Sequence, residues 1–281
     1  MSKGVANGTL DSQSCSVCGS QARIRFSASV LLRYQASFFL CPTCGLLFTP
    51  NPFWLEEAYN SAIAKADTGI LARNVRLSRI ASCFLFSAGV GDRTCIDVAG
   101  GYGLFVRLMR DVGFDFLWSD PYCSNLFARG FEADQNQQAT VATAFEVLEH
   151  VADPVGFIGD LFRSTKCEFL LCSTETFAGE PPAPQDWWYY AFSEGQHISF
   201  YQRETLAKIA GQLGLNLCSE GNIHLFSRTR VSPLRFRVSV NRLSSRVLFP
   251  FVRLFKKSRT MVDHTFLVQN SNRAADHSGN D

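Results

Sequence analysis

The stretch TCIDVAGGYGLFV, residues 94–106, contains the pattern that decides the fold. Residues 95–98 are a short, mostly apolar run of the kind that forms a buried strand. Three glycines, Gly100, Gly101 and Gly103, follow at once, and helical spacing of apolar residues begins directly after them. A strand, a glycine turn and a helix in this order let the backbone approach a ligand closely and direct a helix N-terminus toward it. The sequence therefore predicts a ligand-binding turn at the end of a buried strand.

An acidic residue supports a nucleoside as that ligand. Asp120 follows the next apolar run, and an acid beyond a second parallel strand can bind two ribose hydroxyls. A dinucleotide site would need the pattern G-x-G-x-x-G, but Val106 stands where its third glycine would be. Asp97, inside the first strand, is also foreign to that pattern, and the chain contains no phosphate-binding G-x-x-x-x-G-K-[ST] loop. We therefore expect a nucleoside cofactor of another kind.

Strand and helix patterns alternate beyond residue 94. We expect strands at 95–98, 114–119, near 131–133, 141–145, 168–172, 216–219 and 223–227, with helices at 103–112 and 203–213. Alternation of this kind implies a parallel sheet with helices on both faces. The expected fold class is therefore α/β, with a Rossmann-like, doubly wound, mostly parallel sheet.

Four of the ten cysteines form two C-x-x-C-G pairs with 22 residues between them. These pairs are Cys15 with Cys18 and Cys41 with Cys44. Two such knuckles at the ends of hairpins can place four thiolates around one tetrahedral zinc ion. A four-cysteine site has no open coordination position, so we expect a zinc ribbon with a structural metal. The other six cysteines are scattered, which is typical of small buried hydrophobes in a reducing cytosol.

Two segments resemble a known family. DVAGGYG at 97–103 is similar to the first motif of class I S-adenosylmethionine-dependent methyltransferases, and FEVLEHVADP at 145–154 resembles the signature after their fourth strand. The resemblance covers roughly residues 90–230. Residues 66–74 and 195–201 also resemble segments of a bacterial subgroup with an N-terminal zinc ribbon, which includes sugar C-methyltransferases. Those sugar enzymes carry a further C-terminal domain that a chain of 281 residues is too short to contain, so the acceptor stays open.

The sequence patterns divide the chain into six segments, and the resemblance implies a set of site residues. The division is 1–14 disordered, 15–50 zinc ribbon, 51–93 helical connector or lid, 94–229 methyltransferase domain, 230–270 basic helical extension and 271–281 disordered. The implied S-adenosylmethionine-binding residues are Asp97, Gly100, Gly101, Gly103, Asp120, Asp134 and Phe145. Asp97 would anchor the turn and the amino group of the cofactor, and Asp120 would bind the ribose. Asp134 and Phe145 would border the adenine, while Glu146 would face the sulfonium end.

Methyl transfer to an oxygen or carbon acceptor also needs a base, because the acceptor must lose a proton. Histidine titrates closest to neutral pH, which makes His197 and His150 the candidates for catalysis, with Glu146 beside them. His150 has an equal alternative as a packing and hydrogen-bonding residue near the cofactor. His197 lies in an aromatic segment after the fifth strand, which suits an acceptor lid or simple packing of a large loop. We expect a small molecule or a sugar or polysaccharide precursor as the acceptor.

A basic segment near the C-terminus has three interpretations. Residues 228–259 contain eight arginines, two lysines and no acid, interleaved with large apolar residues. This pattern suits helices packed on the core with solvated arginines, a peripheral contact with an anionic membrane, or a nucleic-acid contact. An RNA methyltransferase and a catalytically silent binding module are the alternative functions. The place after the fourth strand holds FEVL and not an N-P-P-Y-type tetrapeptide, which disfavours nucleic acid as a partner.

The sequence also indicates where the protein resides. No run approaches ~18 uninterrupted apolar residues, and residues 1–8, MSKGVANG, lack the apolar core of a signal peptide. We therefore expect a cytoplasmic protein, with peripheral contact to the inner membrane face as the alternative. The sequence gives no indication of the oligomeric state.

Overall fold

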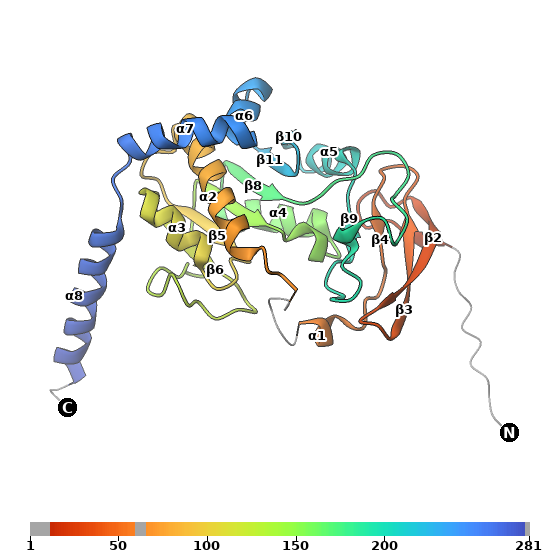
Figure 1. Ribbon diagram of the computed structural model, residues 1–281, viewed down its shortest axis with the longest axis horizontal. Coiled ribbons are helices and arrows are strands. Elements are labelled where there is room, and N and C mark those ends of the chain that lie inside the picture. The colour runs from red at the N-terminus through yellow and green to blue at the C-terminus, as the bar shows by residue number, and fades with distance from the viewer. Residues whose placement is uncertain (1–11, 60–65, 279–281) are drawn as a thin grey trace. The chain divides into compact units, whose positions relative to one another are not determined.

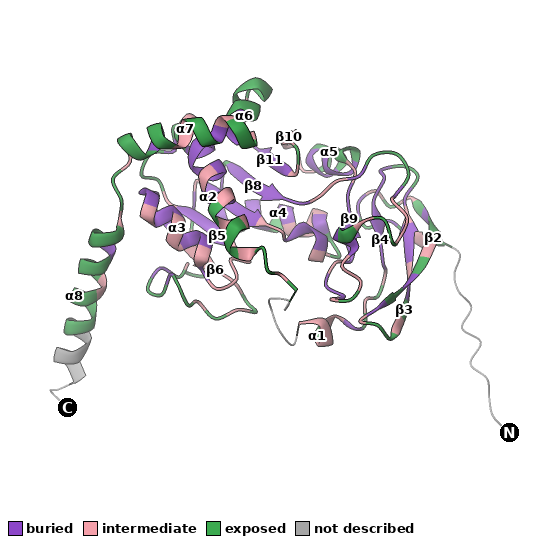
Figure 2. Ribbon diagram, in the orientation of Figure 1, coloured by how far each residue is buried: buried purple, intermediate pink, exposed green. Residues whose placement is uncertain are grey.

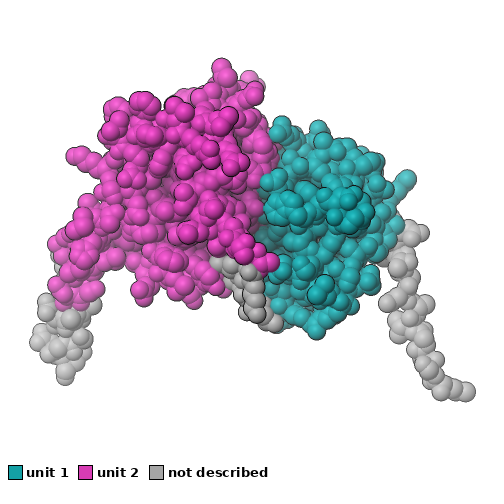
Figure 3. All heavy atoms as spheres, in the orientation of Figure 1, with its two compact units in different colours: residues 1–61, 148–158, 174–214 teal, residues 62–147, 159–173, 215–281 magenta. Residues whose placement is uncertain are grey.

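The computed structural model describes residues 12–59 and 66–278, with side chains described as far as residue 272. The chain divides into two compact units, which are coloured separately in Figure 3. Unit 1 comprises the chain through residue 61 together with 148–158 and 174–214, and unit 2 comprises 62–147, 159–173 and 215–281. Unit 1 therefore contains the N-terminal ribbon together with two segments of the expected methyltransferase domain.

Unit 2 contains a six-stranded sheet with helices around it (Figure 1). Its elements are α2 (Ile70–Ser87), β5 (Cys95–Val98), α3 (Leu104–Val112), β6 (Phe116–Ser119), β7 (Val141–Phe145), β8 (Phe169–Ser173), β10 (Asn216–Glu220), β11 (Ile223–Ser227), α6 (Pro233–Val240), α7 (Arg242–Phe255) and α8 (Thr260–Ser278). Helix α4 (Pro154–Thr165) begins among residues of unit 1 and ends among those of unit 2.

The strand order in this sheet is β10-β11-β8-β7-β5-β6. Strands β6, β5, β7 and β8 are mutually parallel, whereas β11 runs antiparallel to both of its neighbours. The expected α/β class with a mostly parallel sheet is confirmed. In this order β6 lies on one side of β5 and β7 on the other. The chain therefore crosses from one side of β5 to the other between forming β6 and β7.

Both faces of the sheet are buried, as expected for parallel strands covered by helices. On one face, Val141, Phe169 and Leu171 pack in a core cluster with apolar residues of α2, α3, α6 and α7. The alternate strand residues Ala142 and Leu170 face the opposite side and are also fully buried. The strict alternation of strand side chains accounts for this two-sided core.

Buried ion pairs attach α8 to the rest of unit 2. Asp263, whose side chain is 3% exposed, accepts hydrogen bonds from Arg110 at 2.8 Å and from Arg107 at 2.9 Å. Burial by itself would raise the pKa of Asp263, but the hydrogen bonds and charges of these two arginines outweigh it and hold the pKa below its usual range. The carboxylate therefore stays ionised between two cations that neutralise it, which makes it a fixed attachment point for the helix.

Unit 1 contains a five-stranded antiparallel sheet. Its elements are β1 (Ser12–Ser14), β2 (Gln21–Val30), β3 (Tyr34–Leu40), β4 (Leu47–Phe48), α1 (Leu55–Ala58), β9 (Ser199–Phe200) and α5 (Arg203–Gln212), with single 3-10 turns at Leu148–His150 and Trp188–Tyr190. The strand order is β1-β2-β3-β4-β9, and Leu47 pairs with Phe200. The ribbon is thus completed by a strand that comes about 150 residues later in the chain.

Several segments differ from the sequence-based expectations. The strand expected near residues 131–133 is only a single parallel bridge between Trp118 and Glu132, because its short run has few apolar residues to bury. Residues 12–14 pair with β2, although we expected disorder through residue 14; residues 1–11 lie outside the described part. Helix α8 continues to Ser278 where we expected disorder from residue 271, and residues 279–281 are not described.

The connector expected at 51–93 is helical in two described pieces. Only the four residues of α1 are helical in the first piece, and α2 begins at Ile70, directly after Gly69. At the start of α2, Arg73 forms an ion pair with Asp67 and Asn74 donates a hydrogen bond to the carbonyl of Ile70. Residues 60–65 of the connector lie outside the described residues.

Candidate functional site

The change of direction at β5 locates a candidate ligand site in unit 2. In an open α/β sheet, ligands bind beyond the carboxyl ends of the strands, at the point where the strand order reverses. The residues that follow β5, β6 and β7 are the glycine turn, Asp120 and Glu146. Because these three strands are neighbours and parallel, the topology brings the three groups to one edge of the sheet. This is where the sequence places the cofactor.

The turn after β5 has a left-handed backbone at three of its five residues. Ala99, Gly101 and Gly103 have φ values of 54°, 55° and 82°. Left-handed backbone costs little at glycine but is strained at alanine, and such strain concentrates at functional sites. A Cβ atom on Gly103 would also lie 2.6 Å from Oδ1 of Asn125. Both the backbone angle and the close neighbour therefore require glycine at position 103.

Asp120 holds this turn through its carboxylate. One oxygen accepts a hydrogen bond from the backbone N–H of Gly101 at 2.9 Å. The other accepts from the N–H groups of Tyr122 and Cys123 at 2.8 and 2.9 Å. The side chain of Trp118 adds a hydrogen bond from Nε1 to the carbonyl of Gly101 at 2.8 Å. Asp120 is therefore already oriented toward the glycine turn, and the oxygen that accepts from Gly101 retains acceptor capacity for a further donor such as a ribose hydroxyl.

Asp97 is buried, with 3% of its surface exposed, and accepts a hydrogen bond from Oγ1 of Thr143. Burial raises its pKa to about 7; the Thr143 hydrogen bond opposes this rise, and the charge of Asp120 adds to it. The group therefore changes charge close to neutral pH. An ammonium group placed beside Asp97 would favour the ionised form.

This pKa leads to a prediction for cofactor affinity. Below its pKa Asp97 is neutral and cannot pair with an ammonium group. If Asp97 binds the amino group of S-adenosylmethionine, as the resemblance implies, affinity for this cofactor should rise as the pH increases from about 6 to about 8. We expect the affinity to increase by about tenfold, with a midpoint near 7. Calorimetric titration across this range measures it. In an Asp97→Asn variant the affinity should be lower and independent of pH over the same range; an unchanged pH dependence would show that another group titrates.

The residues after β7 form a second fixed feature of this edge. Glu146 has φ 54°, a strained value for a residue with a side chain. Its backbone N–H donates to Oγ of Ser173 at 3.0 Å, and the same hydroxyl donates to Oε1 of Glu146. The ring of Phe145 packs edge-on against Phe105 at 5.0 Å. Ser173 thus fixes the Glu146 carboxylate, a contact that the sequence did not reveal.

Asp134 is exposed and lies in the loop of residues 134–138, which borders an open hollow of about 640 Å³. The loop follows the bridge that pairs Glu132 with Trp118 of β6. Asp134 therefore lies two residues beyond Glu132, the residue that pairs with β6. Its candidate contact with adenine stays a prediction.

A cluster of titratable side chains lies in unit 1. The rings of His150 and His197 contact each other edge-on at 4.9 Å, and Glu149, which is fully buried, has a carboxylate oxygen within 4.8 Å of a ring nitrogen of each histidine. Nδ1 of His150 bonds to the carbonyl of Gln196 at 3.0 Å, and Nδ1 of His197 to the carbonyl of Tyr189 at 2.7 Å. Because a carbonyl only accepts, both neutral rings carry their hydrogen on Nδ1 and their lone pair on Nε2.

This arrangement brings the two predicted histidines together and adds a carboxylate that the sequence analysis missed. Glu149 directly precedes His150 in the chain, and this adjacency could have identified it. Two imidazole nitrogens with lone pairs and one carboxylate can accept a proton, and the same three groups have the composition of a two-histidine, one-carboxylate metal site.

Most of the aromatic residues around His197 are structural. Tyr189, Tyr190 and Phe200 belong to the core cluster of unit 1 and are at most 1% exposed. Trp188 differs, because 77% of its surface is exposed. The aromatic segment is therefore mainly the core of a large loop, and Trp188 is its exposed member.

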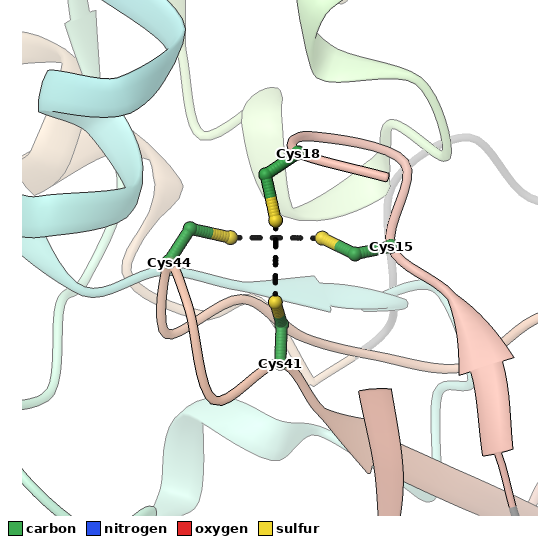
Figure 4. Close-up of side chains that lie close together, drawn as sticks. All are labelled: Cys15, Cys18, Cys41 and Cys44. Carbon is green, nitrogen blue, oxygen red and sulfur yellow. Dashed lines mark hydrogen bonds between the residues drawn. The ribbon is translucent and has the colours of Figure 1, made fainter. Parts of the chain in front are cut away.

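The four cysteines of the two C-x-x-C pairs converge in unit 1 (Figure 4). The sulfur atoms of Cys15 and Cys44 are 3.6 Å apart, and those of Cys18 and Cys41 are 3.4 Å apart. All four lie within 4.8 Å of one another. The hydrogen bond from Cys44 lowers the pKa of Cys15 to about 5, whereas the same bond raises the pKa of Cys44. Four thiolates at this spacing repel one another unless a cation lies between them, so the donor set fits a tetrahedral metal.

Backbone geometry supports each cysteine knuckle. Gly19 and Gly45 follow the pairs with φ values of 72° and 75°, and their N–H groups donate to the carbonyls of Cys15 and Cys41 at 2.9 Å. Helix α5 also contacts both knuckles: Thr205 donates to the carbonyl of Cys44 at 2.6 Å, and Gln212 donates to that of Val17 at 2.8 Å. The knuckles are therefore part of the core of unit 1.

The mostly parallel sheet, the strained glycine turn and the acids that follow β6 and β7 agree with the class of Rossmann-like S-adenosylmethionine-dependent methyltransferases. The chain belongs to this family: residues 71–220, more than half of its length, match the methyltransferase domain family. None of the curated proteins matches the sequence.

Solved structures with a similar fold include several methyltransferases. Mitomycin 7-O-methyltransferase is 16% identical with a TM-score of 0.36, and the match covers 52% of each chain. Magnesium protoporphyrin IX methyltransferase from Synechocystis PCC 6803 is 12% identical with a TM-score of 0.41, covering 62% of this chain and 93% of that one. Human N-acetylserotonin methyltransferase is 11% identical with a TM-score of 0.41, covering 55% and 52%. The present chain thus spans about half the length of the first and the last of these.

Proposed function

We propose that this enzyme methylates an oxygen or carbon atom of a small molecule or of a sugar or polysaccharide precursor, with His197 as the base. The observation that carries this proposal is the hydrogen bond from Nδ1 of His197 to the carbonyl of Tyr189. It leaves the lone pair of the neutral ring on Nε2, which is the form that a general base requires.

The residues at the sheet edge of unit 2 are suited to hold S-adenosylmethionine. The backbone of Gly100, Gly101 and Gly103 lines the turn, Asp97 offers a carboxylate to the amino group, and Asp120 offers one to the ribose. The sulfonium centre of the cofactor supplies an electrophilic methyl group. Phe145 and Asp134 would border the adenine, and the fixed carboxylate of Glu146 would face the sulfonium end.

The reaction then needs removal of one proton. S-adenosylmethionine would supply the methyl group, and Nε2 of His197 would accept the proton that the acceptor loses and later release it to water. A buried carboxylate within reach of the imidazole, here Glu149, favours the imidazolium that forms. His150 lies against His197 and fixes its orientation through the edge-on ring contact.

We further propose that Cys15, Cys18, Cys41 and Cys44 hold a structural zinc ion. Four cysteine ligands leave no coordination position for a substrate, and α5 covers the knuckles. The metal would therefore stabilise unit 1 and take no direct part in methyl transfer.

The base is tested by replacing His197 with alanine. We expect the rate constant for turnover to fall by about 100-fold or more, since general-base catalysis contributes ~10²–10⁴-fold. Cofactor affinity should stay unchanged, because the residues assigned to the cofactor are others. Mass spectrometry of sugar nucleotides and small glycans incubated with labelled cofactor measures turnover, and calorimetry measures affinity. His264→Ala, an exposed histidine in α8, is the matched control.

Two outcomes would change this assignment. Unaltered turnover in His197→Ala would remove the histidine from catalysis. Turnover that disappears on brief treatment with a chelator and returns with a divalent cation, while the zinc content stays constant, would make the cluster of Glu149, His150 and His197 a metal centre.

A further inference from the structure

Helices α6 and α7 present an apolar surface to solvent, although they are packed on the core of unit 2. On α7, Ser245 and Val252 point inward and are buried. On its opposite side, Leu243, Val247 and Leu254 are 71%, 66% and 78% exposed. Figure 2 shows α7 as largely exposed along its length. The inward face of α7 already packs on the core. Large apolar side chains on its outer face therefore add nothing to that packing.

Further large apolar side chains are exposed on α6 and in the last turns of α7. Leu234 and Val238 are exposed on α6, while Phe236 and Val240 on its other side are buried. Phe251 and Phe255 extend the exposed set on α7. We call the exposed apolar residues of these two helices the outer face. Large apolar side chains gathered on the exposed sides of helices often mark a surface that contacts a partner.

A row of arginines borders the outer face. Arg242, Arg246 and Arg253 follow helical spacing on one flank of α7, between its inward side and the outer face. Among residues 12–59 and 66–272 none of the three takes part in an ion pair. Two acids near these helices pair with other cations, Glu220 with Arg237 and Asp92 with Lys256. The border of the outer face is therefore cationic.

We propose that the outer face docks on the surface of an anionic lipid bilayer. Helices that lie in a membrane interface combine large apolar side chains on one face with arginine or lysine beside them, and these charges contact lipid headgroups. A second copy of this chain fits less well, because self-association would bring two arginine rows together. Among the described helices none is long and apolar enough to span a membrane, so the contact would be peripheral.

The full-length protein is sedimented with vesicles of phosphatidylcholine alone and with an equimolar mixture of phosphatidylcholine and phosphatidylglycerol. We expect binding to the anionic vesicles only, weakening as salt increases. The double variant Val247→Glu/Leu254→Glu should weaken binding at least about tenfold, because acidic side chains cannot enter the interface. Arg246→Gln/Arg253→Gln should weaken it about fivefold per arginine. Leu32→Glu, at a site that is 82% exposed in unit 1, is the matched control and should bind normally.

Because the substituted side chains are exposed, the variants should keep the melting temperature and S-adenosylmethionine affinity of the natural chain. The proposal is overturned if the natural protein binds neither vesicle, or binds both equally. A dimer in analytical ultracentrifugation that Val247→Glu/Leu254→Glu converts to a monomer would assign the outer face to a second copy. Single-stranded RNA that binds through Arg246 and Arg253 would assign it to nucleic acid. None of these outcomes depends on the identity of the methyl acceptor.

Discussion

An Asp120→Ala variant should lose measurable affinity for S-adenosylmethionine. In this structure the carboxylate already holds the glycine turn through Gly101 and is the acid that follows β6. Removing it would delete the acceptor for the ribose hydroxyls and loosen the turn at the same time. Two hydrogen bonds to a charged group are worth about 3 kcal/mol or more together, so the dissociation constant should rise about 100-fold or more. Calorimetric titration of cofactor into the folded variant measures this effect.

The control for this experiment is Asp160→Ala, which removes a carboxylate that is 68% exposed and pairs with Arg163 on α4. It should bind the cofactor as the natural chain does. An isosteric Asp120→Asn variant can keep the oxygen that accepts from the N–H groups of Tyr122 and Cys123 while it replaces the oxygen that accepts from Gly101. If Asp120→Ala bound the cofactor as tightly as the natural chain, the ribose assignment would be wrong.

The second large effect concerns the cysteine cluster. Replacing Cys44 with serine should release the zinc ion and destabilise unit 1 by about 4 kcal/mol or more, since loss of a structural metal is among the most damaging changes in a protein. Metal analysis should give one zinc per natural chain and none in the variant. In thermal unfolding, the loss of stability should appear as a lower temperature of the first unfolding transition. A variant that kept its zinc and its melting temperature would contradict a four-cysteine site.

Cys218→Ser is the appropriate comparison, because Cys218 is a partly buried cysteine of β10 outside the cluster. It should retain the metal and most of the stability. Treating the natural protein with a chelator at mildly acidic pH should reproduce the effect of Cys44→Ser. Cysteine thiols must be deprotonated to bind a metal, and a lower pH favours their protonation.

Much of the fold of unit 2 follows from local sequence. The bounds of β5, β7 and β11 agree with the apolar runs at 95–98, 141–145 and 223–227. Helix α3 begins one residue after Gly103, because the left-handed glycine ends the turn and the apolar spacing of a helix follows. These signals are readable because each arises within a few neighbouring residues. The region near Glu132 had no such run, and only a single bridge forms there.

Contacts between distant segments could not be predicted in this way. The sequence identified His150 and His197 separately, but only folding shows that their rings are in contact and that Glu149 joins them. The hydroxyl of Ser173, which fixes Glu146, lies at the end of a different strand. No local pattern reports which residues will be neighbours across a sheet, since that depends on the packing of the whole unit.

The pairing of β4 with β9 has a consequence for biosynthesis. The four cysteines leave the ribosome early, but the strand that pairs with Leu47 and the helix that covers the knuckles come about 150 residues later. At ~5–20 residues per second, this interval lasts roughly 8 to 30 s. During that time the thiols of the nascent chain are accessible to metal, and to oxidants. If the four cysteines hold the proposed zinc ion, metal supply during translation should affect how much of the newly made protein reaches its native form.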